Sequence, residues 1–134
     1  MRFFALVSAL AVAGFAAAQE AARFGSIDVE PCNFTGGQDV QVNYDATSAI
    51  AAGNSPDSVS VWIQGTFNDT GNQTPFFKIA DHDFNDGSNV FSSDVTIPAQ
   101  INDLGASNWV ATAFIEYEKN GLTQFGGVSN GCAQ

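Results

Sequence analysis

Apolar and polar residues alternate along most of the chain after residue 20. A period of two is typical of β-strands that bury one face, and amphipathic helical periodicity is hard to find in the same region. Clusters of Gly, Asn, Asp and Pro separate the alternating segments, as turns do. We predict strands over residues 38–44, 58–65, 75–81, 90–98, 108–121 and 122–130.

The alternation also assigns each strand an inward and an outward face. The predicted inward positions are Val40, Val42, Tyr44, Val59, Val61, Ile63, Trp109, Ala111, Ala113, Ile115 and Tyr117. Between Val59 and Ile63 this leaves Ser60 and Trp62 pointing outward, followed by Gln64. These outward residues become candidates for contact with a ligand.

The connections between strands complete the fold prediction. Lys119-Asn120-Gly121 is a strong hairpin signal, because Asn and Gly accept the positive φ of a tight turn. Residues 45–57 read as a connection with at most one helical turn around residues 48–52. We predict an all-β fold, a single immunoglobulin/fibronectin-like β-sandwich of about seven antiparallel strands. A small antiparallel β-barrel is the alternative.

The first residues have the pattern of a secretory signal peptide. Arg2 precedes an apolar run, and Ala16 and Ala18 fit the small-residue rule for cleavage before Gln19. We therefore expect a signal peptide over residues 1–18 and a β-sandwich domain over residues 19–134. The run is too short for a membrane span, so we expect a secreted protein, extracellular or in a cell wall, with no membrane association after cleavage.

Charge excludes one class of partner. All fourteen acidic residues follow the predicted cleavage site, against Arg23, Lys78 and Lys119. Nucleic-acid binding depends on Lys and Arg that neutralise phosphates, so we expect no nucleic-acid partner. The sequence carries no signal for an oligomeric state.

Two cysteines, Cys32 and Cys132, stand near the two ends of the predicted domain. In a secreted chain, two cysteines allow one intramolecular disulfide. Closing a loop of about 100 residues stabilises the fold by roughly 4–5 kcal/mol in the chain-entropy model. We predict the pair Cys32–Cys132.

Three Asn-X-Thr motifs are candidate N-glycosylation sites: Asn33, Asn68 and Asn72. Asn68 and Asn72 share one polar stretch, which predicts an exposed loop. We expect a glycoprotein.

The order of segments GGQDVQVNY, VSVWIQG, PFFKIADHDFNDGSNVFSSDVTIP, WVATAFIEYEKNG and GVSN resembles the extracellular sandwich domain of fungal Ser/Thr-rich, GPI-anchored cell-wall proteins that are linked to β-glucan assembly. Tyr44 stands where that family usually has Trp. The leader, the sequons and the size are also similar to those of small secreted proteins of mushroom-forming fungi. The resemblance implies a non-enzymatic extracellular module.

Residues 81–89, DHDFNDGSN, surround the only histidine with Asp81, Asp83 and Asp86. An EF-hand register fails, because the required Gly comes one residue late and Ser92 replaces the bidentate Glu. Since Asp, Asn, Gly and Ser also form turns, we predict a solvent-exposed connection without a metal or cofactor. A weak calcium site stays as the alternative; a zinc site on His82 lacks further ligands.

Catalytic signatures are weak. His82 has no serine elbow to work with, so a Ser-His-Asp triad is not expected. Glu116 and Glu118 share one strand face at a spacing that suits paired carboxylates, but an outer strand face supplies no cleft. We expect no enzymatic activity.

Outward Trp62, with Gln64 beside it, is the best candidate for contact with a ligand. Aromatic rings edged by amides bind sugars on flat sandwich faces, and Phe67, Phe76, Phe77 and Phe84 are candidates to join them. We expect a small secreted protein that acts by binding a cell-wall polysaccharide or an extracellular protein. The alternatives are a carbohydrate-binding module centred on Trp62 and a secreted effector or immunomodulatory protein.

Overall fold

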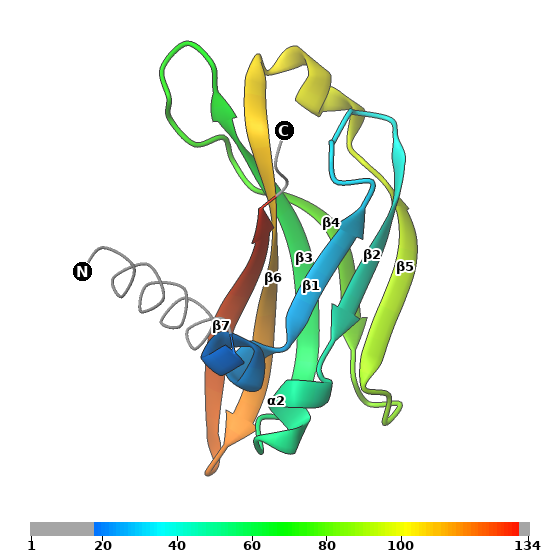
Figure 1. The fold of residues 1–134 in the computed structure, drawn as a ribbon, viewed down its shortest axis with the longest axis vertical. Coiled ribbons are helices and arrows are strands. Elements are labelled where there is room, and N and C mark those ends of the chain that lie inside the picture. The colour runs from blue at the N-terminus through cyan, green and yellow to red at the C-terminus, as the bar shows by residue number, and fades with distance from the viewer. Residues whose placement is uncertain (1–17, 132–134) are drawn as a thin grey trace, which may run out of the picture.

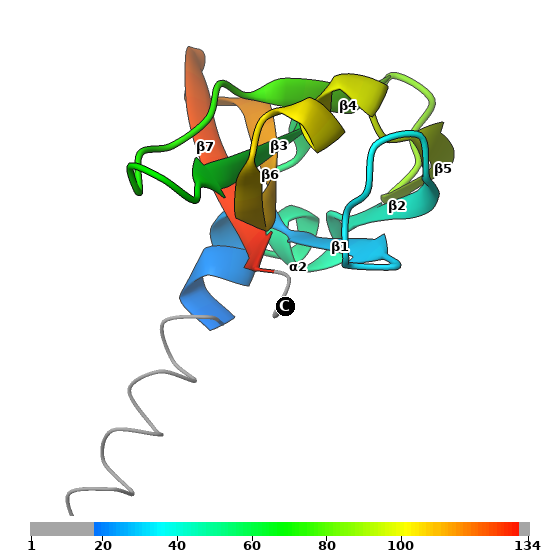
Figure 2. The same cartoon turned by 90° about the horizontal axis from the view of Figure 1, so that it is seen from above.

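Two antiparallel sheets packed face to face make up the domain (Figures 1 and 2). The computed structural model describes residues 18–131. The three-stranded sheet has the order β1-β2-β5, formed by β1 (Ser26–Glu30), β2 (Asp39–Asp45) and β5 (Val90–Thr96). The four-stranded sheet has the order β4-β3-β6-β7, formed by β4 (Phe77–Asp83), β3 (Pro56–Phe67), β6 (Ala106–Lys119) and β7 (Leu122–Gly131). The predicted seven-stranded sandwich is confirmed, and the described strands do not close into a barrel.

Helices are few and short. Residues 18–24 are helical, α2 (Thr47–Ala51) lies in the connection between β2 and β3, and the 3-10 helix η1 (Ala99–Asp103) precedes β6. α2 confirms the single helical turn expected there. None of the helices in the described residues has the length and apolar character needed to span a bilayer.

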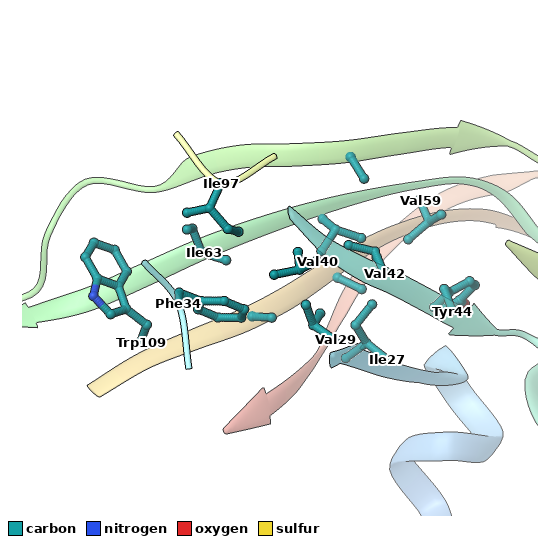
Figure 3. Packing of buried hydrophobic residues seen from close by; sticks show 14 of the residues in the cluster. Ile27, Val29, Phe34, Val40, Val42, Tyr44, Val59, Ile63, Ile97 and Trp109 are labelled. Carbon is teal, nitrogen blue, oxygen red and sulfur yellow. The ribbon is translucent and has the colours of Figure 1, made fainter. Parts of the chain in front are cut away.

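The core lies between the sheets and consists mainly of the inward residues of both, joined by residues from the connections such as Phe34 and Ile97 (Figure 3). All eleven predicted inward residues are buried, and Val42, Val61 and Ile63 are fully inaccessible to solvent. Trp109 packs at one end of this core, where an added Cβ on Gly65 would stand 2.8 Å from the indole. Gly65 therefore makes room for the largest buried ring.

Strand β1 is not among the strands predicted from the sequence. It pairs with β2 so that Ile27 lies opposite Tyr44 and Val29 opposite Val42. Ile27 and Val29 are buried and extend the core beyond the six predicted strands. Only two apolar residues alternate in this five-residue strand, which is too few for a recognisable period.

The predicted hairpin between β6 and β7 is confirmed. Asn120 and Gly121 have φ values of 56° and 73°, and Lys119 pairs with Leu122 across the turn. Both central residues therefore adopt the left-handed conformation that the Asn-Gly pair favours.

The prediction that residues 81–89 form one exposed connection is wrong in its first part. β4 continues to Asp83, with His82 opposite Val59 and Asp83 opposite Ser58 on β3. Only residues 84–89 connect β4 to β5. The short ladder with β3 supplies hydrogen bonds that outweigh the turn preference of the aspartates.

The beginning of the predicted mature chain is held against the domain. The Tyr44 hydroxyl donates to the Phe24 carbonyl at 2.7 Å, and the Asn54 side-chain amide donates to the Ala22 carbonyl at 3.0 Å. Phe24 also contacts the Tyr117 ring edge-on, with 6.4 Å between centroids. The predicted signal peptide, residues 1–18, lies outside the described residues except for its last position.

The predicted disulfide is only half inside the described region. Cys32 follows β1, and no cysteine is free among the described residues. β7 lies beside β1, where Asn130 donates to Asp28 at 3.0 Å, so the chain leaves β7 on the side of the domain that carries Cys32. Cys132 lies outside the described residues, and its pairing with Cys32 stays a prediction.

Candidate functional site

The outer face of the four-stranded sheet carries a group of aromatic side chains, of which Trp62 is half-buried and the others are exposed. We call Trp62, Phe76, Phe114 and Phe125 the aromatic face. Trp62 lies on β3, Phe114 on β6 and Phe125 on β7, and Phe76 directly precedes β4. The alternation that buries Val61 and Ile63 places Trp62 outward, as predicted.

Three of these rings surround a shallow hollow. It has a volume of about 340 Å³ and is lined by Ser60, Trp62, Phe76 and Phe114. The rings of Phe76 and Phe114 meet edge to face, with 5.6 Å between centroids. Phe76 and Phe114 remain 43% and 41% exposed, and Phe125 is 75% exposed. Large apolar side chains this exposed and this close together are typical of binding surfaces.

The strand register explains how the hollow forms. Ser60 stands opposite Phe114 on one side and Asp81 on the other, and Phe114 in turn stands opposite Gly127. The small residues on both sides of Phe114 leave its ring uncovered. The Phe114 ring on β6 therefore stands between two neighbours with little or no side chain, Ser60 and Gly127.

Only part of this face is predicted from the sequence. Trp62 and Phe76 were named, whereas Phe77 points onto Trp109 with 6.2 Å between centroids and Phe84 packs on Tyr44 at 5.7 Å. Phe114 and Phe125 were missed as ligand contacts. Alternation predicts that Phe114 points outward. Its place beside Ser60, however, depends on the register between β3 and β6, which the sequence does not reveal.

Most polar atoms at the hollow already have partners. The Trp62 indole nitrogen donates to the Ser60 hydroxyl at 2.9 Å. The Gln64 amide donates to the Thr74 carbonyl at 2.8 Å, which ties β3 to the segment before β4. Gln64 therefore has a structural role. A contact between Gln64 and a sugar stays a prediction.

A row of acidic side chains borders the aromatic face. Asp83, Ser58, Glu116 and Phe125 stand side by side on β4, β3, β6 and β7. In the next row, Asp81 forms an ion pair at 2.7 Å with Lys78, which stands opposite Trp62 one row further on. We call Asp83 and Glu116 the carboxylate row. Since Lys78 is already paired, this end of the face is negative.

The three-stranded sheet presents a different outer face. Its register places Asp28, Asn43 and Ser92 in one row and Glu30, Gln41 and Asp94 in the next. No aromatic ring interrupts these two rows. The aromatic character is therefore confined to one of the two outer faces.

His82 lies on the inward side of β4 and has an aromatic environment. Its ring stacks on Phe91 with 4.8 Å between centroids and meets Phe84 edge-on at 4.7 Å. Its Nε2 is buried without a hydrogen-bond partner and lies 3.8 Å from Asp86 Oδ2. The backbone N–H and hydroxyl of Ser88 donate to Asp86, which lowers the pKa of that carboxyl.

The three candidate calcium ligands are not brought together. Asp81 is paired with Lys78, Asp83 stands next to Ser58, and Asp86 faces His82 and Ser88. Within residues 18–131 no group of three His, Cys, Asp or Glu side chains is placed to hold a metal ion. The geometry offers the calcium alternative no support.

Glu116 and Glu118 lie on the outer side of β6, as the alternation predicts. Neither of them lines the aromatic hollow. Glu116 stands opposite Phe125 of the aromatic face, and Glu118 lies two residues further along β6, opposite Thr123.

The asparagines of the three sequons are exposed, and the loops that carry them lie at one end of the sandwich (Figure 1). The Asn68 side-chain oxygen accepts from the Ser107 hydroxyl at 2.6 Å. Thr74, the third residue of the Asn72 sequon, is only 2% exposed. Its hydroxyl accepts from the Gly65 N–H at 3.0 Å and donates to the Pro75 carbonyl at 2.9 Å. Glycan attachment at Asn33, Asn68 and Asn72 stays a prediction.

The candidate site therefore combines an aromatic hollow with an acidic border on an open sheet face. In comparisons with known proteins, no family model, no curated protein and no solved structure matches the chain.

Proposed function

We propose that this protein is a small secreted, non-enzymatic domain that acts by binding polysaccharide on its aromatic face. The observation that carries the proposal is the hollow formed by Trp62, Phe76 and Phe114 on an open sheet. A single exposed ring would need no explanation, but three rings around one hollow form a surface that apolar contact with a ligand would stabilise.

The chemistry of sugars fits such a surface. A pyranose ring has an apolar face of C–H groups and a polar edge of hydroxyls, so it stacks on an aromatic ring while its edge bonds to surrounding polar groups. Thr112 and Ser129, whose hydroxyls lie 2.8 Å apart, stand in the same row as Trp62 and Lys78. They supply polar groups beside the rings.

An open sheet face also suits a polymer better than a small molecule. A long chain extends across several strands and gains contacts from each, whereas a small ligand in a shallow hollow buries little of its surface. The resemblance to fungal wall proteins makes wall glucans and chitin the first polysaccharides to test.

Co-sedimentation of the purified protein with insoluble wall polysaccharides tests the proposal. We expect Trp62→Ala and Phe114→Ala to lower the bound fraction, with about a tenfold loss of affinity for each stacking ring. Val90→Ala is the matched control, because Val90 is 56% exposed but lies on β5 in the other sheet. Equal sedimentation of all three variants with the wild type would refute the proposal.

A further inference from the structure

We infer that the aromatic face prefers a polysaccharide whose sugars carry protonated amines, that is, an aminosugar polymer. The inference rests on the proposed function and specifies its ligand. It follows from the charges that surround the aromatic hollow.

The electrostatic balance of this face is negative. Among the described residues, Lys78 is the only cationic residue that the strand register places on the outer side of the four-stranded sheet. Asp81 forms an ion pair with it at 2.7 Å. Asp83, Glu116 and Glu118 then remain without a cation on the same side. A neutral glucan gains nothing from these carboxylates, and an acidic polysaccharide is repelled by them. A cationic ligand has complementary charge.

The positions of the charges match a ligand that is stacked on the rings. Glu116 stands two residues after Phe114 on the same face of β6, which is about 6.6–6.8 Å along the strand. Asp83 stands two strands away from Glu116, about 9.5 Å across the sheet. A sugar chain that stacks on Phe114 and continues along β6 toward Glu116, or diagonally toward Asp83 on β4, therefore brings its next units over carboxylates.

The hollow itself favours a polymer of sugars over a basic peptide. It is lined by three rings and only one hydroxyl, and that hydroxyl is occupied by the Trp62 indole. An amine alone would interact with the carboxylate row but leave the hollow unfilled. A ligand with both an apolar ring face and an amine uses the two features together.

The experiment compares three soluble oligosaccharides of equal length and linkage: oligomers of glucose, of glucosamine and of N-acetylglucosamine. Each is titrated into the secreted protein at a pH at which the glucosamine amines are protonated. Affinity is measured by calorimetry and by the emission of Trp62. Poly-lysine is the fourth ligand and represents charge without sugar rings.

We expect the glucosamine oligomer to bind tightest. The double variant Asp83→Asn/Glu116→Gln should lower that affinity about two- to fivefold and leave the other two oligomers unchanged. Added salt should have the same selective effect, because it screens exposed charges. Trp62→Ala should weaken all three oligomers. The matched control is Glu30→Gln/Asp94→Asn, which removes two exposed carboxylates from one row of the opposite sheet.

Other outcomes separate the two proposals. If all three oligomers bind equally and Trp62→Ala weakens them, the preference for amines is refuted while the proposed function stands. If no oligomer binds, both are refuted. If poly-lysine binds as tightly as the glucosamine oligomer and Trp62→Ala changes neither, the face is a simple charge site and the inference fails.

Discussion

Individual side chains fix the segment that precedes Phe76, one of the rings of the aromatic hollow. Gly65 leaves room for the Trp109 ring, and its N–H is satisfied by the Thr74 hydroxyl rather than by a strand partner. Thr74 also bonds to the Pro75 carbonyl, directly before Phe76. The position of one aromatic ring of the hollow thus depends on a buried threonine.

Thr74→Val is expected to destabilise the protein by about 1–3 kcal/mol, because it removes the acceptor of the Gly65 N–H and leaves that donor buried without a partner. Chemical denaturation measures the change. Thr74→Ser restores the hydroxyl and should recover most of the stability. Since Thr74 also completes a sequon, Asn72→Gln is the control that removes the sequon alone; a loss equal to that of Thr74→Val would assign the effect to a glycan.

The stability contributed by Asp86 should depend on pH. Bonds from Ser88 hold the pKa of this carboxyl below its usual value, so the folded state favours the charged form. The contribution is present above the unfolded pKa of about 3.9 and disappears as the pH falls through the lower folded pKa. Asp86→Asn should therefore lower the melting temperature at neutral pH, and the difference should vanish in acid.

Thermal unfolding of both proteins across pH checks this expectation. Asp94→Asn on β5 removes one exposed charge elsewhere and serves as the control. A melting difference for Asp86→Asn that is the same at neutral and acidic pH would contradict the assigned role of the Ser88 bonds.

Among the elements, the long strands could be predicted from the sequence and the short ones could not. β3 and β6 alternate over enough residues to reveal their period, and their buried residues were assigned correctly. β1 has only Ile27 and Val29 as inward apolar residues, and the end of β4 has a turn-like composition. In these two places, pairing with a neighbouring strand decides the structure, and this information is not local.

The same limit applies to the candidate site. The outward direction of Trp62 follows from its own strand, so it was found. The hollow depends on which residues of β3, β6 and β7 stand opposite one another, including Ser60 and Gly127 beside Phe114. Such register between strands distant in sequence cannot be derived from local alternation.

The helical segment over residues 18–24 is joined to β2 by one buried hydroxyl. Tyr44 donates to the Phe24 carbonyl at 2.7 Å, and burial raises the pKa of Tyr44, so the hydroxyl remains a donor well into the alkaline range. Tyr44→Phe should cost about 0.5–1.5 kcal/mol and release this segment. Hydrogen exchange of residues 19–24 should rise selectively. Unchanged exchange there would show that the Asn54–Ala22 bond and the Phe24 ring contacts hold the segment without the Tyr44 hydroxyl.

At the scale of the whole molecule, the outer faces of the two sheets differ in their aromatic content. The three-stranded sheet exposes polar and acidic rows, and the four-stranded sheet exposes aromatic rings with an acidic border. The predicted glycans would extend from one end of the sandwich. Those loops lie at the ends of strands, so glycans there would leave the middle of the aromatic face accessible.

The predicted Cys32–Cys132 bond would join the beginning and the end of the sandwich. It should contribute roughly 4–5 kcal/mol, because it closes a loop of about 100 residues. We expect Cys32→Ser to lower the denaturation midpoint by a corresponding amount, and the intact mass under non-reducing conditions to show no free thiol. Two free thiols in the purified protein would contradict the predicted bond.

The central claim is that the aromatic face binds polysaccharide, and tryptophan fluorescence tests it most directly. Trp109 is only 3% exposed, so Trp62 is the tryptophan that responds to a ligand on the outer face. We predict a saturable shift of its emission on titration with soluble wall oligosaccharides, weakened about tenfold in Phe114→Ala. Unchanged Trp62 emission throughout a titration with soluble oligosaccharides of the same polysaccharide that sediments the protein would contradict the claim.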